Sequence, residues 1–63
     1  MKKFEVRFDG EERTAVLVDG CGFAFLGEDG NFEETASFRE SEILKQLNED
    51  HEACIADGWV TEI

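Results

Sequence analysis

KFEVRFDG, residues 3–10, alternates charged and apolar side chains and ends in an Asp-Gly pair. Alternation with a period of two is typical of a β-strand with one buried face, here carrying Phe4, Val6 and Phe8. Asp-Gly is a strong turn signal, because both residues tolerate the positive φ that a type I′ hairpin requires. The stretch therefore predicts a strand that turns back to pair with the next segment.

The same turn signal recurs along the chain, at Asp19-Gly20, Asp29-Gly30 and Asp57-Gly58. The first three Asp-Gly pairs are ten residues apart, which matches one strand and one turn. Two further strand-like runs lie between them, at residues 14–18 and 21–26. In the second run Phe23 and Phe25 share a face. We therefore predict three antiparallel strands in meander order.

The hydrophobic period then changes to that of an amphipathic helix. Its predicted apolar stripe consists of Phe38, Ile43, Leu44 and Leu47. Residues 37–40, Ser-Phe-Arg-Glu, fit the capping box that begins a helix. We expect the helix to start at this box.

Acidic residues 49, 50 and 52 would oppose the dipole of that helix at its C-terminal end. They suit the first turn of a second, short helix beginning near Asn48 or Asp50, capped by Gly58 and followed by a strand over 59–63. The alternative is a hairpin, in which residues 53–56 and 59–63 are strands that pair across Asp57-Gly58. We favour the short helix.

The sequence thus predicts one α+β domain over residues 1–63. It consists of a three- to four-stranded antiparallel meander with one or two helices on one face. The expected core is Phe4, Val6, Phe8, Phe23, Phe25, Leu44, Leu47 and Trp59.

Charge is the strongest functional signal. The 63 residues contain 16 Asp and Glu against 6 Lys and Arg, a net charge of −10. Such a field repels nucleic acid and anionic membranes and attracts basic protein surfaces. No apolar run is long enough for a signal peptide or a membrane span, so we expect a cytoplasmic protein.

We expect Cys21 and Cys54, which match no zinc, haem or CxxC spacing, to be reduced core residues.

No catalytic, metal or cofactor site is expected. The single histidine, His51, lies in an acidic run and is expected to be exposed at a helix end. No G-x-S-x-G elbow is present to hold a nucleophile. A calcium loop starting at Asp29 would need Gly at its sixth position, where the chain has Glu34. We therefore expect a protein that is not an enzyme.

Nine acids fall within residues 28–52, opposed only by Arg39 and Lys45, whereas the N-terminal third carries four of the six basic residues. This asymmetry predicts an acidic face as the partner-binding site. The nine residues are Glu28, Asp29, Glu33, Glu34, Glu40, Glu42, Glu49, Asp50 and Glu52.

In size, acidity and α+β pattern the chain resembles the small phage-encoded inhibitors, notably anti-CRISPR proteins and other DNA mimics. The resemblance implies inhibition by occupying a basic nucleic-acid channel, without direct contact to nucleic acid. The alternative is a small acidic adaptor or structural protein whose charge serves solubility or halophily. A homodimer of that protein would cover exposed apolar sheet surface such as Ala15 and Leu17.

Overall fold

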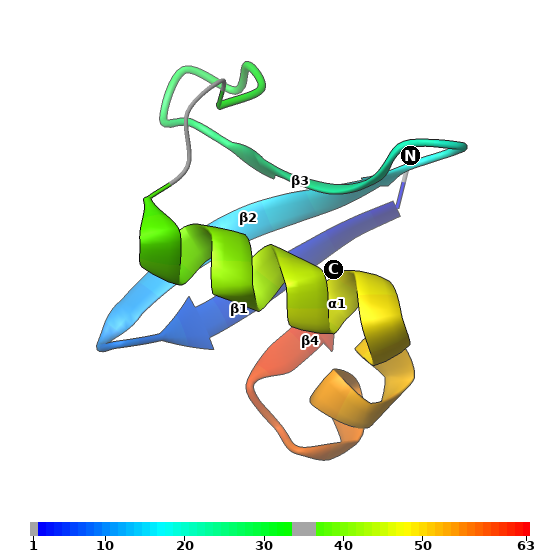
Figure 1. Cartoon of the computed structure of the whole chain (residues 1–63). Coiled ribbons are helices and arrows are strands. Elements are labelled where there is room, and N and C mark those ends of the chain that lie inside the picture. The colour runs from blue at the N-terminus through cyan, green and yellow to red at the C-terminus, as the bar shows by residue number, and fades with distance from the viewer. Residues whose placement is uncertain (1, 34–36) are drawn as a thin grey trace.

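A computed structural model describes residues 2–33 and 37–63 (Figure 1). Its elements are β1 (Lys2–Phe8), β2 (Glu11–Val18), β3 (Gly22–Leu26), α1 (Phe38–Ala56) and β4 (Val60–Glu62). The four strands form one antiparallel sheet in the order β3-β2-β1-β4, and α1 lies across one face of it (Figure 1). The predicted α+β class, with a meander and a helical layer on one face, is confirmed.

The first turn forms as the sequence predicts. Asp9 and Gly10 both have positive φ, 52° and 77°, and Phe8 pairs directly with Glu11 across the turn. The second turn differs, because at Asp19-Gly20 only the glycine has positive φ. Gly22 also has a positive φ of 91°, and a Cβ there would lie 2.6 Å from the Asn48 side chain. The approach of the helix therefore shapes this turn and requires glycine at position 22.

The core lies between α1 and the sheet. Of the predicted core residues, Phe4, Val6, Phe23, Phe25 and Leu47 are buried, while Phe8, Leu44 and Trp59 are half-buried against them. The core also contains Ala15, Ile43, Cys54 and Val60.

The expectation that Ala15 and Leu17 form exposed apolar surface is wrong. Ala15 is 0 % exposed, and Leu17 packs against the core. The sheet register explains this: Ala15 lies opposite both Phe4 and Phe25, so it shares their helix-covered face.

The start of α1 confirms the predicted capping box. Ser37 is the N-cap residue, and its Oγ accepts a hydrogen bond of 3.2 Å from the backbone N–H of Glu40. The predicted apolar stripe is only partly right: Ile43 and Leu47 are buried, but Phe38 is 83 % exposed. Nine residues span about two and a half helical turns, so Phe38 lies on the side of the helix opposite Leu47.

The helix breaks at Asp50, whose φ of −163° and ψ of 82° are not helical. The Asp50 carboxylate accepts a hydrogen bond of 3.2 Å from the backbone N–H of Ala53 and so caps the segment after the break. Gly58, with φ 90°, follows the last turn, and its N–H donates to the Ile55 carbonyl. The predicted second short helix is confirmed, and the bend is visible in Figure 1. The alternative hairpin is wrong, because residues 53–56 are helical and β4 pairs with β1.

The outer edge of β3 is used within the molecule. The backbone N–H of Phe23 donates to Asn48 Oδ1 at 2.8 Å, and the Phe25 carbonyl accepts from the N–H of Glu33 at 3.0 Å. Phe32 also forms an isolated β-bridge to Leu26. The segment after β3 therefore folds back along the strand and positions the loop that carries Glu28 and Asp29.

Candidate protein-binding surface

Arg13 forms the most buried ion pairs of the described residues. It lies half-buried on the helix-covered side of β2, with its guanidinium carbon 5.1 Å from the centre of the Phe25 ring. Its Nη1 donates to Glu40 at 3.1 Å, and its Nη2 donates to Glu33. Burial lowers the pKa of Arg13, but hydrogen bonds and charge from Glu33 and Glu40 outweigh burial and raise it above the ordinary value. Glu33 and Glu40 are therefore occupied within the fold.

The other ion pairs lie on the surface. Arg39 donates to Asp9 at 2.9 Å and lies 3.8 Å from Glu42. Two further pairs join Arg7 to Glu5, at 3.3 Å, and Lys2 to Glu62, at 3.6 Å. Exposed pairs of this kind are screened by water and salt and hold their carboxylates only weakly.

A large excess of carboxylates remains after this pairing. Six of the sixteen acids take part in the ion pairs and Glu34 lies outside the described residues, which leaves nine acids with no ion pair in the described part of the chain. All nine are exposed. In the same part of the chain, Lys3 and Lys45 are the only basic residues that have no ion pair. The nine are Glu11, Glu12, Asp19, Glu28, Asp29, Glu49, Asp50, Glu52 and Asp57.

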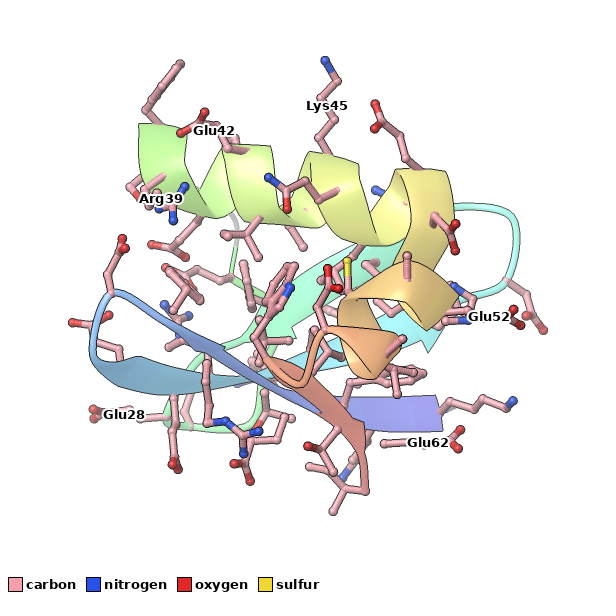
Figure 2. All side chains as sticks on the ribbon, turned by 90° about the horizontal axis from the view of Figure 1, so that it is seen from below. Glu28, Arg39, Glu42, Lys45, Glu52 and Glu62 are labelled. Atoms are coloured by element: carbon pink, nitrogen blue, oxygen red, sulfur yellow. The ribbon has the colours of Figure 1, made fainter. Side chains whose placement is uncertain are left out.

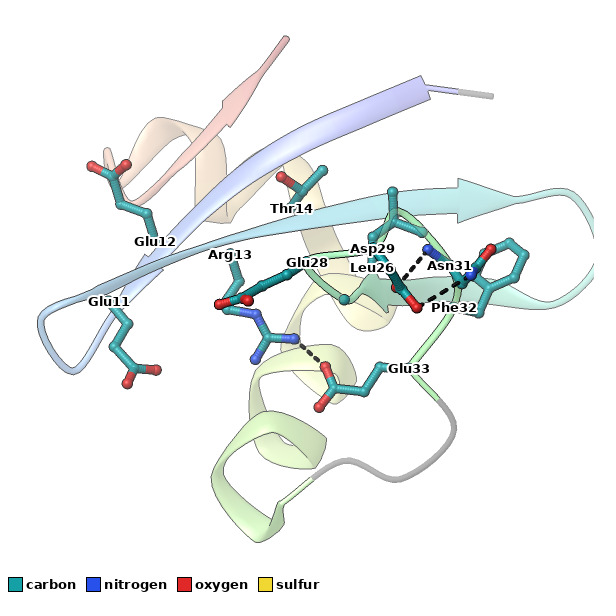
Figure 3. A pocket seen from close by; sticks show the side chains of 11 residues that line it. Glu11, Glu12, Arg13, Thr14, Leu26, Glu28, Asp29, Asn31, Phe32 and Glu33 are labelled. Atoms are coloured by element: carbon teal, nitrogen blue, oxygen red, sulfur yellow. Dashed lines mark hydrogen bonds and ion pairs between the residues drawn. The ribbon is translucent and has the colours of Figure 1, made fainter.

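The first group, which we call the hollow acids, is Glu11, Glu12, Glu28 and Asp29. They line a hollow of about 850 Å³ between the start of β2 and the loop after β3 (Figure 3). Asp29 accepts hydrogen bonds from the backbone N–H of Asn31, at 3.0 Å, and from its side chain, and these bonds lower the pKa of Asp29. The loop is thus ordered around a carboxylate that is held in its charged form.

The second group, which we call the helix-end acids, is Glu49, Asp50, Glu52 and Asp57. They lie at and after the break in α1. Asn48 contacts the first part of β3, whereas the hollow includes its last residue, Leu26, so Glu49, Asp50 and Glu52 lie toward the opposite end of β3 from the hollow acids. Asp57 lies apart from these three, because the next residue, Gly58, accepts a hydrogen bond from Arg7 in the last part of β1. Figure 2 shows Glu28 and Glu52 on opposite sides of the molecule.

The nine predicted site residues are therefore not gathered on one face. Glu28 and Asp29 join the hollow, and Glu49, Asp50 and Glu52 join the helix end. Of the remainder, Glu33 and Glu40 pair with Arg13, Glu42 faces Arg39, and Glu34 lies outside the described residues. Sequence reasoning missed two hollow acids. The missed residues are Glu11 and Glu12, whose position just after the first turn was the available signal.

The histidine and the two cysteines, the other side chains with possible catalytic or metal-binding chemistry, show no arrangement for either role in the described residues. His51 is half-buried, with its ring centre 5.4 Å from that of Phe23 and 6.0 Å from that of Phe4, so its expected exposure is wrong. Both cysteines are free thiols, and Cys54 is buried as expected, but Cys21 is exposed, so its expected place in the core is wrong. Burial, with Asp57 and Asp50 nearby, raises the pKa of Cys54. Within residues 2–33 and 37–63, no three His, Cys, Asp or Glu residues are grouped to hold a metal ion.

Comparison with known proteins adds no functional information, since no protein-family model, curated protein or solved structure matches the chain. No helix in the described part of the chain has the length and apolar composition to cross a bilayer. The surface itself carries the functional argument. Exposed carboxylates accept hydrogen bonds from lysine and arginine side chains and attract basic surfaces from a distance.

Proposed function

We propose that this protein is a non-enzymatic binding protein of the cytoplasm. Its exposed carboxylates dock on the basic surface of a nucleic-acid-binding protein and block that surface. One observation carries the proposal: among the described residues, nine exposed carboxylates have no ion pair, whereas only two lysines have none. Folding therefore leaves most of the negative charge available to a partner.

The net negative charge of the protein is more than half that of duplex DNA of the same length. The protein measures 28 × 28 × 21 Å and has a net charge of −10. Duplex DNA of that length carries about 16 phosphate charges, at about one per 1.7 Å of axis. Acids at both ends of the sheet suit an elongated basic channel, which would meet one group first and the other farther along.

The first test is capture of the partner. The immobilised protein is incubated with lysate of its source organism at about 50 mM and about 500 mM salt, and retained proteins are identified. We expect a nucleic-acid-binding protein to be retained at low salt and to be displaced by high salt and by duplex DNA. Retention that neither salt nor DNA affects, or no retention at low salt, would overturn the proposal and leave solubility as the role of the charge.

The second test uses charge reversal at each end of the sheet. Glu11→Lys with Glu28→Lys alters the hollow, and Glu49→Lys with Glu52→Lys alters the helix end. We expect at least one pair to weaken partner binding about tenfold or more, because each replaces attraction by repulsion. Each pair is a control for the other, since both change the net charge equally, and thermal melting checks that the fold is kept.

The choice of residues in this test follows from the structure. Glu33, Glu40 and Asp50 are left unchanged, because reversing them would break the Arg13 pairs or the helix cap. Equal affinity of both reversed proteins and the parent would show that the carboxylates do not form the contact.

A further inference from the structure

Phe38 is the most exposed large apolar side chain of the described residues, at 83 %. It lies at the start of α1, on the side facing away from the sheet, and takes no part in the core. An aromatic side chain left in water contributes little to folding, whereas aromatic residues are enriched in the centres of protein interfaces. The fold thus gives Phe38 no structural task.

The neighbours of Phe38 form a polar surface on which two glutamates, Glu42 and Glu49, flank one lysine, Lys45. Phe38 and the residues one, two and three turns farther along α1 line a shallow hollow of about 520 Å³. We call this surface the outer helix face. Figure 2 shows Lys45 pointing away from the sheet on this side and Glu42 in the turn before it. Its residues are Phe38, Ser41, Glu42, Lys45, Gln46 and Glu49.

We infer that Phe38 is the apolar anchor with which this protein holds its partner, an inference that rests on the proposed function. The partner chemistry it fits is a basic protein surface with an apolar pocket, whose lysine or arginine side chains meet Glu42 and Glu49 while the pocket takes Phe38. Glu49 has no ion pair among the described residues, and Glu42 has only the 3.8 Å contact to Arg39.

The net charge of the protein favours a basic partner over a second copy of the chain, an anionic membrane or nucleic acid. A second copy would bring another net charge of −10 against the first, and an anionic membrane or nucleic acid would be repelled in the same way. A basic surface gains attraction from the net charge of the whole molecule, and on the outer helix face Glu42 and Glu49 outnumber the single cation, Lys45. Central apolar anchors surrounded by charged rims are the usual arrangement of binding energy in protein interfaces.

The test uses two synthetic peptides of equal length and charge. One is an amphipathic helix of leucine and lysine, and the other has serine in place of every leucine. Affinity is measured by calorimetry, and the contact is mapped by amide shifts in nuclear magnetic resonance spectra. We expect the leucine peptide to bind more tightly and to shift the amides of the outer helix face.

Phe38→Ala should then weaken binding of the leucine peptide about tenfold or more and leave the serine peptide unaffected. Ile63→Ala is the matched control, since Ile63 is 71 % exposed and lies outside this face. The melting temperature of Phe38→Ala should equal that of the parent, because the side chain is already in water.

The outcomes separate this inference from the proposed function. If both peptides bind equally and Phe38→Ala changes nothing, the apolar anchor is wrong and docking through carboxylates stands. If neither peptide binds at low salt, the proposed function itself fails. Shifts confined to surfaces away from α1 would likewise overturn the role of Phe38.

Discussion

Among single residues, Arg13 has the largest structural task of the six basic side chains. It joins β2 to Glu33 after β3 and to Glu40 in the first turn of α1, while its guanidinium covers the Phe25 ring. These contacts hold both ends of the connection between sheet and helix. The same contacts withdraw two acids from the surface that a partner can reach.

Replacing Arg13 by alanine should lower the free energy of unfolding by about 2 kcal/mol, because it removes charge-assisted hydrogen bonds and leaves two half-buried carboxylates unpaired. Urea denaturation measures the change. Lys45→Ala is the matched control, since it removes the same charge from an exposed side chain and should alter stability by less than about 0.5 kcal/mol. Equal effects of the two substitutions would show that Arg13 acts only through net charge.

At the scale of elements, the break in α1 sets the course of the C-terminal third. Asp50 ends the first helical segment and caps the second with its own carboxylate. The change of direction places His51 against Phe4 and Phe23 and leads the chain to β4 beside β1. A straight helix of the same length would carry these residues away from the sheet.

Asp50→Ala should therefore destabilise the protein by about 1 kcal/mol, the usual cost of losing an N-cap side chain. Glu49→Ala removes the same charge one residue earlier without removing a cap. The comparison is made by thermal melting, followed by circular dichroism. A Glu49→Ala protein that is destabilised as much as Asp50→Ala would mean that the cap contributes nothing.

Features encoded in short stretches of sequence were predicted correctly. The alternation in β1, the turn at Asp9-Gly10, the Ser37 cap and the second helix each depend on residues close together in the chain. The prediction for Phe38 was wrong because it placed Phe38 on the same face of the helix as Leu47, although a spacing of nine residues puts the two on opposite faces. The site was predicted less well than the fold, since the Arg13 pairs join residues 20 and 27 positions apart and only the packed structure brings them together.

For the whole molecule, most of the unpaired negative charge lies in two separate places, the hollow beside β2 and β3 and the part of α1 at and after its break. Glu28 of the first group and Glu52 of the second lie on opposite sides of the molecule. Charges that far apart repel one another only weakly at physiological salt, where the Debye length is about 8 Å. At low salt the repulsion reaches across the entire molecule, whose longest extent is 28 Å. Stability should therefore depend on ionic strength.

We expect the melting temperature to rise as sodium chloride increases from about 0.01 M to about 1 M, as the Debye length falls from about 30 Å to about 3 Å. Differential scanning calorimetry measures the rise. A Glu28→Gln, Glu52→Gln protein, with two fewer charges, should show a smaller increase. A melting temperature that falls with salt would mean that the ion pairs outweigh the repulsion.

The outer edge of β3 has a consequence for the fate of the protein at high concentration. Exposed strand edges let identical chains join their sheets and grow into fibrils. Here the Asn48 side chain and the Glu33 backbone already bind the outward groups of Phe23 and Phe25. The edge of β3, two of whose five residues are phenylalanine, is therefore protected from pairing with a second chain, and mutation of Asn48 would free the N–H of Phe23 at that edge.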